Sequence, residues 1–178
     1  TLESIAFAGS QTDVGQSATT PKDAVLKSGT TDRNYFYNIQ YIPGVLTVTP
    51  QPVVVYIEGE IKDKIYDGKA ETIGYSIKSI EDSSGLFKES MIVFNGSDTD
   101  KTLTKTDAGE YILSLQNRFS SSSPNFSVDF HILDGKLTID KRHLILTSDS
   151  ASKDYDGSEL RADNIAISVP TGVDYSGF

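Results

Sequence analysis

Apolar and polar residues alternate along several stretches of the chain, most clearly over 126–133. Every second residue there is apolar, as Phe126, Val128, Phe130 and Ile132. A period of two predicts a strand with one buried face. Other stretches rich in β-branched and aromatic residues predict further strands, over 53–57, 73–80, 91–94, 110–115 and 137–139.

The segments between these strands carry turn and loop signals. Asp134-Gly135 predicts a hairpin between 126–133 and 137–139, because glycine reaches positive φ at little cost. Residues 120–124 predict a loop, and 115–119 a single helical turn. Without a long amphipathic helix, the pattern favours a mainly β fold, either a small sandwich or a mostly-β α+β arrangement. The predicted core consists of Tyr56, Ile65, Ile73, Ile77, Phe94, Leu103, Tyr111, Leu113, Phe130 and Leu137.

A repeat with a period near 90 residues runs through the chain. Gly44-Val45-Leu46-Thr47-Val48 recurs as Gly135-Lys136-Leu137-Thr138-Ile139. Other matches occur in the same order along the chain, and they join 7–10 with 94–97, 12–15 with 106–109, 34–35 with 125–126, 53–56 with 144–147, and 64–68 with 153–157. Self-similarity at a fixed period is typical of tandem modules.

The order of the matches predicts the domain boundaries. Residues 51–140 form one complete repeat, the central module. Residues 1–50, the N-terminal part, carry motifs from the later portion of a module, and residues 141–178, the C-terminal part, carry those of the early portion. The two parts complement each other. We therefore expect that the C-terminal part completes the N-terminal part of the same or another chain. Completion by another chain would give a homo-oligomer by swapping.

Composition excludes several classes of function. The chain has no cysteine, which rules out disulfides, thiolate zinc sites and a cysteine nucleophile, and it has only two histidines. The net charge of −9 disfavours nucleic acid and anionic membrane surfaces as partners. No apolar run reaches the roughly 20 residues that a membrane span needs, and the first ten residues do not read as a signal peptide.

Two repeated motifs could hold functional groups or only turns. Tyr66-Asp67-Gly68 recurs as Tyr155-Asp156-Gly157, and its aspartates could bind a metal ion or a carbohydrate. Recurrence at the module period favours a structural Asp-Gly turn that a buried tyrosine anchors. Asp107, Gly109 and Tyr111 resemble the turn before strand F of immunoglobulin-like domains, although Leu113 stands where those domains have cysteine. This motif too is interpreted as turn chemistry.

The remaining candidates predict no catalytic or metal site and no cofactor. Asp98, Asp100 and the acidic stretch 149–159 lack the spacing of a twelve-residue calcium loop. No Gly-x-Ser-x-Gly nucleophile elbow is present, so the chain is not expected to be an enzyme. A lysine–asparagine isopeptide crosslink, with Lys62 or Lys64 as donor, stays open as an alternative.

Three motifs together resemble the MBG (YDG-type) repeats of bacterial cell-surface adhesins. The motifs are Lys-x-Tyr-Asp-Gly, Asp-[Ala/Val]-Gly and Gly-x-Leu-Thr-[Val/Ile]. The resemblance covers the whole chain, and residues 9–15, 38–50 and 148–160 are close to the usual sequence of the family. It implies tandem immunoglobulin-like or β-grasp-like modules in an elongated arrangement. It also implies an extracellular location, on the cell wall of a Gram-positive bacterium or secreted.

The resemblance implies a non-catalytic stalk whose partners are neighbouring repeats of the same protein. Pro50 and Pro52 leave only a short joint before the central module, which favours a rod. The alternative is a module that binds host glycan or protein through exposed loops. The crowded aromatic residues that could form such a surface are Tyr35, Phe36, Tyr37 and Tyr41.

Overall fold

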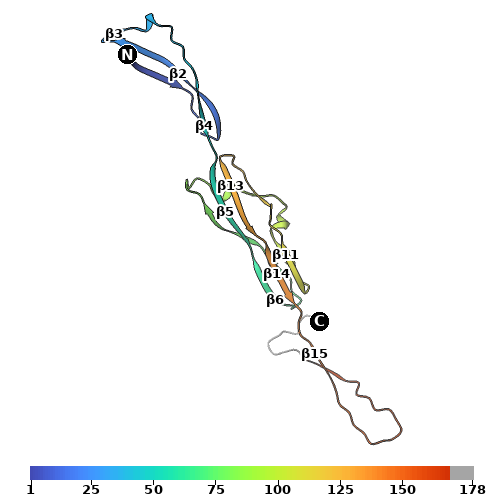
Figure 1. The fold of residues 1–178 in the computed structure, drawn as a ribbon. Helices are drawn as coiled ribbons and strands as arrows, with labels where there is room; N and C mark the ends of the chain where they lie inside the picture. The colour runs from blue at the N-terminus through green and yellow to red at the C-terminus, as the bar shows by residue number, and fades with distance from the viewer. Residues whose placement is uncertain (169–178) are drawn as a thin grey trace. The chain divides into compact units, whose positions relative to one another are not determined.

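The computed structural model describes residues 1–168, and the chain is mainly β, as predicted (Figure 1). Strands β1 to β16 are joined by loops and three short 3-10 helices. None of the helices in this part of the chain is long and apolar enough to cross a bilayer. The chain divides into two compact units, which are described separately below.

The first unit comprises Thr1–Val55, Ser79–Phe94 and Phe119–Phe130. Its N-terminal sheet is antiparallel and is built around the long strand β2. Its elements are β1 (Leu2–Ala8), β2 (Gly15–Ser28), β3 (Thr31–Asp32), the 3-10 helix η1 (Asn34–Phe36) and β4 (Gly44–Val48). Only Ala24 is buried among residues 1–50, so this sheet has almost no core of its own.

Aromatic side chains form a small cluster in the rest of the first unit. The strands β9 (Ile92–Phe94) and β12 (Phe119–Ser121) pair antiparallel. The 3-10 helix η2 (Glu89–Met91) directly precedes β9. The Phe119 ring lies 5.3 Å from that of Phe94 and 6.2 Å from that of Phe130. Phe87 and Phe126 pack edge to face at 5.1 Å. Edge-to-face contacts of this kind add to the stability gained from burial alone.

A three-stranded sheet has the order β13-β5-β8. Its strands are β5 (Gln51–Gly59), β8 (Tyr75–Glu81) and β13 (Phe126–Leu133). Alternate residues of β5, namely Val53, Val55 and Ile57, are fully buried, so one face of this strand is part of the core. Its neighbours Val54 and Tyr56 are half-buried, as expected for the second face of a pleated strand.

Within the described residues, the second unit comprises Tyr56–Lys78, Asn95–Arg118 and 131–168. Its main sheet has β14 in the middle, antiparallel to β11 and parallel to β6. A two-stranded sheet pairs β7 with β10. The elements are β6 (Ile61–Ile65), β7 (Glu71–Ile73), the 3-10 helix η3 (Asp98–Lys101), β10 (Leu103–Lys105), β11 (Gly109–Leu113) and β14 (Gly135–Asp140). Ile73, Leu115, Leu137 and Ile139 form its core.

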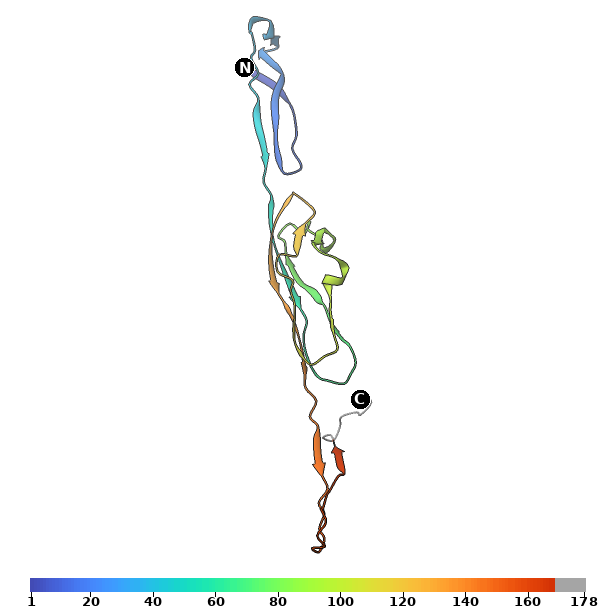
Figure 2. The ribbon, with the colours of Figure 1, turned by 90° about the vertical axis from the view of Figure 1, so that its right-hand side faces the viewer.

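Residues 145–168 of the C-terminal part fold back on themselves as a hairpin. Strands β15 (Ile145–Ser148) and β16 (Ile165–Ser168) pair antiparallel, and a long loop joins them (Figure 2). Every residue from 143 to 168 is exposed. This hairpin therefore has no core within the described residues.

The predicted strands are confirmed, with one interruption at Gly74, which separates β7 from β8. Of the ten predicted core residues, Ile73, Leu113 and Leu137 are buried. Six others are half-buried, namely Tyr56, Ile77, Phe94, Leu103, Tyr111 and Phe130. The prediction for Ile65 is wrong, because its side chain lies on the outer face of the edge strand β6 and is 57% exposed.

The predicted hairpin at Asp134-Gly135 is also wrong. Only Asp134 separates β13 from β14, and the two strands belong to different sheets. The Asp134 carboxylate accepts a hydrogen bond from the Leu115 amide at 2.7 Å, which fixes it to a neighbouring segment. Gly135 is buried and packs against Gly59, so the chain passes directly from one sheet into the next.

Residues 115–118 form a tight turn instead of the helical turn predicted over 115–119, and Phe119 already belongs to β12. The Arg118 amide donates to the Leu115 carbonyl at 3.1 Å, and Asn117 has a φ of 60°. A residue in this left-handed region cannot continue a right-handed helix. The predicted loop over 120–124 is shorter than expected, because Ser120 and Ser121 belong to β12.

Candidate functional site

The repeat seen in the sequence recurs in the strand pairing. In the N-terminal sheet Gly15 lies opposite Val48, and Thr19 lies opposite Gly44. In the second unit the matching residues pair in the same register, Gly109 with Ile139 and Leu113 with Gly135. Two stretches of different sequence thus form the same five-residue antiparallel ladder. Because register is set by side-chain packing and turn geometry, this agreement points to a common local structure.

The Tyr-Asp-Gly motif forms the same turn in both copies. The Asp67 carboxylate accepts from the Lys69 amide at 2.9 Å and pairs with Lys64 at 2.8 Å. The Asp156 carboxylate accepts from the Ser158 amide at 2.8 Å and pairs with Lys153 at 2.7 Å. Gly68 and Gly157 follow with φ values of 74° and 73°, a region that glycine adopts readily.

These contacts lower the pKa of both aspartates. The hydrogen bond from Lys64 is the main cause for Asp67. For Asp156 the hydrogen bond from Lys153 leads, and the pKa falls to about 2. The carboxylates are therefore ionised at neutral pH and already hold a lysine and a backbone amide. In both turns the aspartate carboxylate makes its contacts with groups of the turn and its flanks.

The two tyrosines of this motif differ in their surroundings. Tyr66 is half-buried, and its amide donates to the Asp140 carbonyl at the end of β14 at 2.9 Å. Tyr155 is 98% exposed. The expectation of a buried tyrosine anchor is therefore wrong for Tyr155, because no second strand lies beside this turn in the described chain as β14 lies beside the turn at Tyr66.

Lys62 and Lys64 both face the carboxylate of Glu71. The Lys62 ammonium lies 2.8 Å from Glu71 and that of Lys64 lies 3.5 Å from it. The hydrogen bond from Lys62 lowers the pKa of Glu71. An isopeptide crosslink needs a buried lysine that faces an asparagine, whereas the lysines here are paired with acids and Lys62 is 41% exposed.

The Asp107, Gly109 and Tyr111 motif closes the turn before β11. The Tyr111 hydroxyl donates back to the Asp107 carbonyl at 3.1 Å, and Tyr111 itself is half-buried. A Cβ on Gly109 would lie 3.0 Å from this hydroxyl oxygen, so glycine leaves room for the bond. The motif acts as a local brace.

Tyr111→Phe is expected to remove this brace without disturbing the packing of the ring. A hydrogen bond of this kind contributes about 0.5–1.5 kcal/mol to stability, so the free energy of unfolding should fall by that amount. Urea denaturation followed by circular dichroism measures it. Tyr37→Phe, at an exposed position, is the control and should leave the midpoint unchanged. Equal losses in the two variants would contradict the role of the Tyr111 hydroxyl.

Asp82 holds a loop that the sequence did not single out. Its carboxylate accepts from the Ser84 amide at 2.9 Å and from the Phe87 amide at 2.8 Å. These bonds position the buried ring of Phe87 against Phe126. The turn signal Asp-Ser-Ser-Gly at 82–85 could have revealed this loop.

The stability that Asp82 supplies should depend on pH. Hydrogen bonds, first from the Ser84 hydroxyl and then from the Phe87 amide, lower its pKa from 3.8 to about 2. Because the folded pKa is depressed, the contribution is complete above pH 4 and is lost as the pH falls toward 2. Asp82→Asn should therefore be less stable than the wild type at pH 7, and the difference should shrink between pH 4 and pH 2. Urea unfolding at several pH values tests this, with the exposed Asp63→Asn as control; a constant difference would contradict it.

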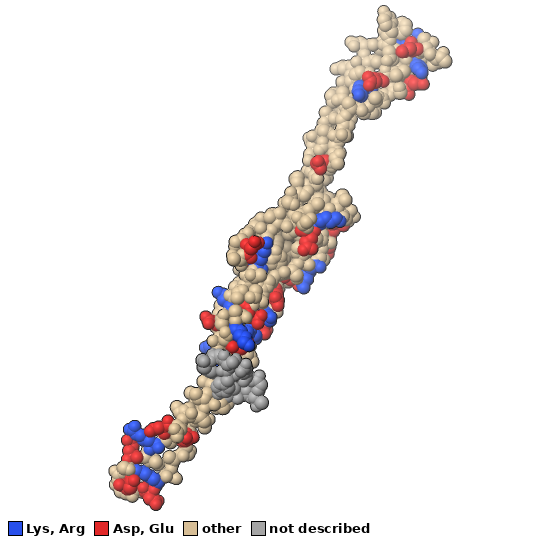
Figure 3. All heavy atoms as spheres, turned by 180° about the vertical axis from the view of Figure 1, so that it is seen from behind, with Lys and Arg blue, Asp and Glu red and all other residues tan. Residues whose placement is uncertain are grey.

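The carboxylates of the acidic loop at 97–101 are already paired with protein groups. Asp98 pairs with Lys101 at 2.7 Å, and Asp100 caps the Ser97 amide and pairs with Arg118 at 3.0 Å. Among residues 1–168, no group of three or more histidine or acidic side chains lies close enough to hold a metal ion. Acidic and basic side chains also mix along the face seen in Figure 3, so neither sign gathers into a large patch there.

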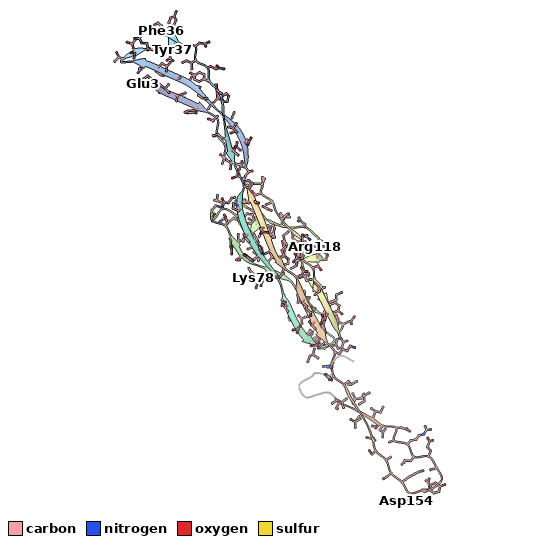
Figure 4. All side chains as sticks on the ribbon, in the orientation of Figure 1. Glu3, Phe36, Tyr37, Lys78, Arg118 and Asp154 are labelled. Carbon is pink, nitrogen blue, oxygen red and sulfur yellow. The ribbon has the colours of Figure 1, made fainter. Side chains whose placement is uncertain are left out.

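One hollow of about 560 Å³ lies on the N-terminal sheet. Its lining has no carboxylate, and it consists of Thr1, Leu2, Leu26, Lys27, Ser28, Arg33, Phe36 and Tyr37. Phe36 and Tyr37 follow shortly after β3 (Figure 4), with the Arg33 guanidinium 5.6 Å from the Phe36 ring. Tyr41 is not part of this surface, because its hydroxyl accepts from the Ala24 amide at 2.9 Å.

No protein-family model, curated protein or solved structure matches this chain.

Proposed function

We propose that the chain is a non-catalytic structural repeat, a stalk or spacer of a bacterial cell-surface adhesin-like protein of the MBG (YDG-type) kind. It would be extracellular, on the cell surface or secreted, without cofactor, nucleic-acid partner or membrane insertion. The observation that carries the proposal is the shared ladder, in which β2–β4 and β11–β14 pair in one register. Both copies of the Tyr-Asp-Gly turn also use their aspartates to hold the backbone.

Contacts beside the predicted joint before the central module support a spacer. Within the first compact unit, the Val14 amide donates to the Asn125 side-chain oxygen at 2.8 Å. The side-chain nitrogen of Asn125, Nδ2, donates in turn to the Asp13 carboxylate at 2.8 Å. Pro50 restricts φ in the connection between β4 and β5, and Pro52 restricts it at the second residue of β5. A stiff joint is what a spacer between an anchor and a distant tip requires.

Small-angle X-ray scattering tests the spacer role. A compact protein of this length has a radius of gyration of about 16 Å, and we expect a clearly larger value with an elongated distance distribution. A head-to-tail fusion of two copies should then extend the maximum dimension nearly in proportion. A radius near the compact value, measured at concentrations where the chain is monomeric, would contradict the proposal.

The second candidate is a module that contacts host glycan or protein. The hollow beside Phe36 and Tyr37, next to a 95% exposed Tyr35, favours it. However, Tyr35 matches Phe126 in the repeat, and Phe126 packs on Phe87. This match favours a packing role for Tyr35. A glycan array tests the second candidate against the spacer. Glycan binding that Tyr37→Ala abolishes would support the second candidate, and the absence of glycan binding supports the spacer.

A further inference from the structure

One edge of β4 has no strand beside it. Among residues 1–168, β4 pairs with β2 alone, whereas the matching strand β14 lies between β11 and β6. In β14 the Lys136 amide donates to Glu60 and the Asp140 carbonyl accepts from Tyr66, so alternate residues point their backbone groups toward β6 and its continuation. The matching residues of the N-terminal part are Val45, Thr47 and Thr49, and all three are exposed.

Side chains of the N-terminal part are also less buried than their counterparts. Leu137 and Ile139 of β14 are buried, but the matching Leu46 and Val48 are only half-buried. Tyr35 is exposed, whereas its match Phe126 is half-buried. The two sheets have the same strand register, so the difference in side-chain burial comes from the elements that lie against each sheet. In the second unit that cover includes the early strand β6.

The segment that matches β6 lies in the C-terminal part. Ile61–Ile65 corresponds to residues 150–154, and Tyr66 corresponds to Tyr155. Residues 150–154 form no strand and are classed as exposed, and Asp154 lies on the long loop between β15 and β16 (Figure 4). The fully buried Val53 and Val55 match Leu144 and Leu146, which are exposed. The C-terminal part thus carries an early-strand sequence without the surface that covers it in the central module.

We propose that β4 of one copy binds residues 150–154 of a second copy as a parallel edge strand. The register follows from the pairing of β14 with β6 and places Val45 opposite Ser150, Thr47 opposite Ser152, and Thr49 opposite Asp154. The inference rests on the proposed function, because it takes the three parts of the chain as copies of one module.

A second copy is the occupant that keeps the order of a tandem repeat. In the central module the early strand β6 precedes β14, whereas in a single chain residues 150–154 follow β4. Joining the C-terminal part of one copy to the N-terminal part of the next restores that order at each junction. Such contacts are heterologous, so they continue into chains or close into rings. Strand addition to a free edge supplies the backbone hydrogen bonds for this contact.

Thr47→Pro tests the edge directly. Thr47 matches Thr138, whose backbone N–H faces β6 by alternation from Lys136, so the proline removes a donor on the free edge and leaves the ladder with β2 intact. By light scattering, the wild type should exceed its monomer mass of 19.4 kDa as its concentration rises. Thr47→Pro should stay monomeric, and Thr47→Val, which keeps the N–H, should associate as the wild type does. A wild type that is monomeric throughout, or association of Thr47→Pro, would overturn the proposal.

Engineered thiols test the register and the occupant. The chain has no cysteine, so each introduced thiol is unique. Oxidising a mixture of Thr47→Cys and Ser152→Cys copies should give a covalent dimer, because opposite residues in adjacent strands lie within disulfide reach. Ala151→Cys replaces Ser152→Cys in the control and should give none, since its side chain points to the other face. Absence of the mixed dimer overturns the register. A Thr47→Cys/Ser152→Cys chain that closes on itself at high dilution overturns the second copy as occupant.

Failure here is distinguishable from failure of the spacer proposal. An elongated chain that stays monomeric would overturn the strand exchange and leave the spacer standing. A compact monomer would overturn the spacer whatever the thiols show.

Discussion

Gly59→Ala is expected to disrupt the second unit severely, although it adds only one methyl group. A Cβ at Gly59 would lie 2.1 Å from the amide nitrogen of Gly135 and 2.4 Å from its Cα. Both are backbone atoms, so no change of rotamer relieves the clash, and the ends of β5 and β14 must separate. This also strains the hydrogen bond from the Lys136 amide to the Glu60 carbonyl. We expect a loss of about 3 kcal/mol or more in the free energy of unfolding.

Thermal unfolding followed by circular dichroism measures this loss, which corresponds to a drop of roughly 6–12 °C in Tm. Gly74→Ala is the matched control in the same unit. A Cβ there would meet the Lys101 carbonyl and the Thr102 methyl group at 3.9 Å, an ordinary contact distance. The control should stay within about 0.5 kcal/mol of the wild type. A similar loss in both variants would show that the close approach of Gly59 and Gly135 is not what limits this position.

Leu137→Ala is expected to cost about 2–5 kcal/mol, because it leaves a cavity in a packed core. Leu137 is fully buried in β14, the strand that holds β11 and β6 together. Leu46→Ala makes the same chemical change at the matching position of β4, which is half-buried. Its cost should be clearly smaller.

Chemical denaturation at low protein concentration compares the two leucines while the chain is monomeric. The slope of the unfolding curve should be unchanged, so that the midpoint alone reports the loss of stability. Equal losses would mean that the N-terminal sheet already buries Leu46 as fully as the second unit buries Leu137. That result would contradict the difference in cover between the two ladders.

The sequence predicted the strands well because their signals are local. Alternation over 126–133 and the β-branched run at 53–57 need no information from the rest of the chain. The turns at Asp67 and Asp156 were predictable for the same reason, since an Asp-Gly pair bends its own backbone. The repeat matched segments of the two ladders, 12–15 with 106–109 and 44–48 with 135–139, and the structure then showed that they pair in the same register.

The errors occur where distant residues decide the outcome. Asp134-Gly135 has the composition of a hairpin, but contacts with Leu115 and Gly59 send the chain into another sheet. In β6 the alternation is inverted, because Lys62 and Lys64 turn toward Glu71 and leave Ile65 outside. The exposure of Tyr155 was equally hidden, since a motif does not reveal whether a neighbouring strand is present.

The parallel pairing of β14 with β6 decides how the second unit resists force. Tension applied through the chain on both sides pulls the start of β6 one way and the end of β14 the other. In a parallel pair these pulls act along the strands, so the hydrogen bonds between them share the load and must slide together. An antiparallel hairpin pulled at its two free ends would instead open one bond after another, like a zipper. Since forced unfolding is governed by the unfolding rate, this load sharing should delay rupture.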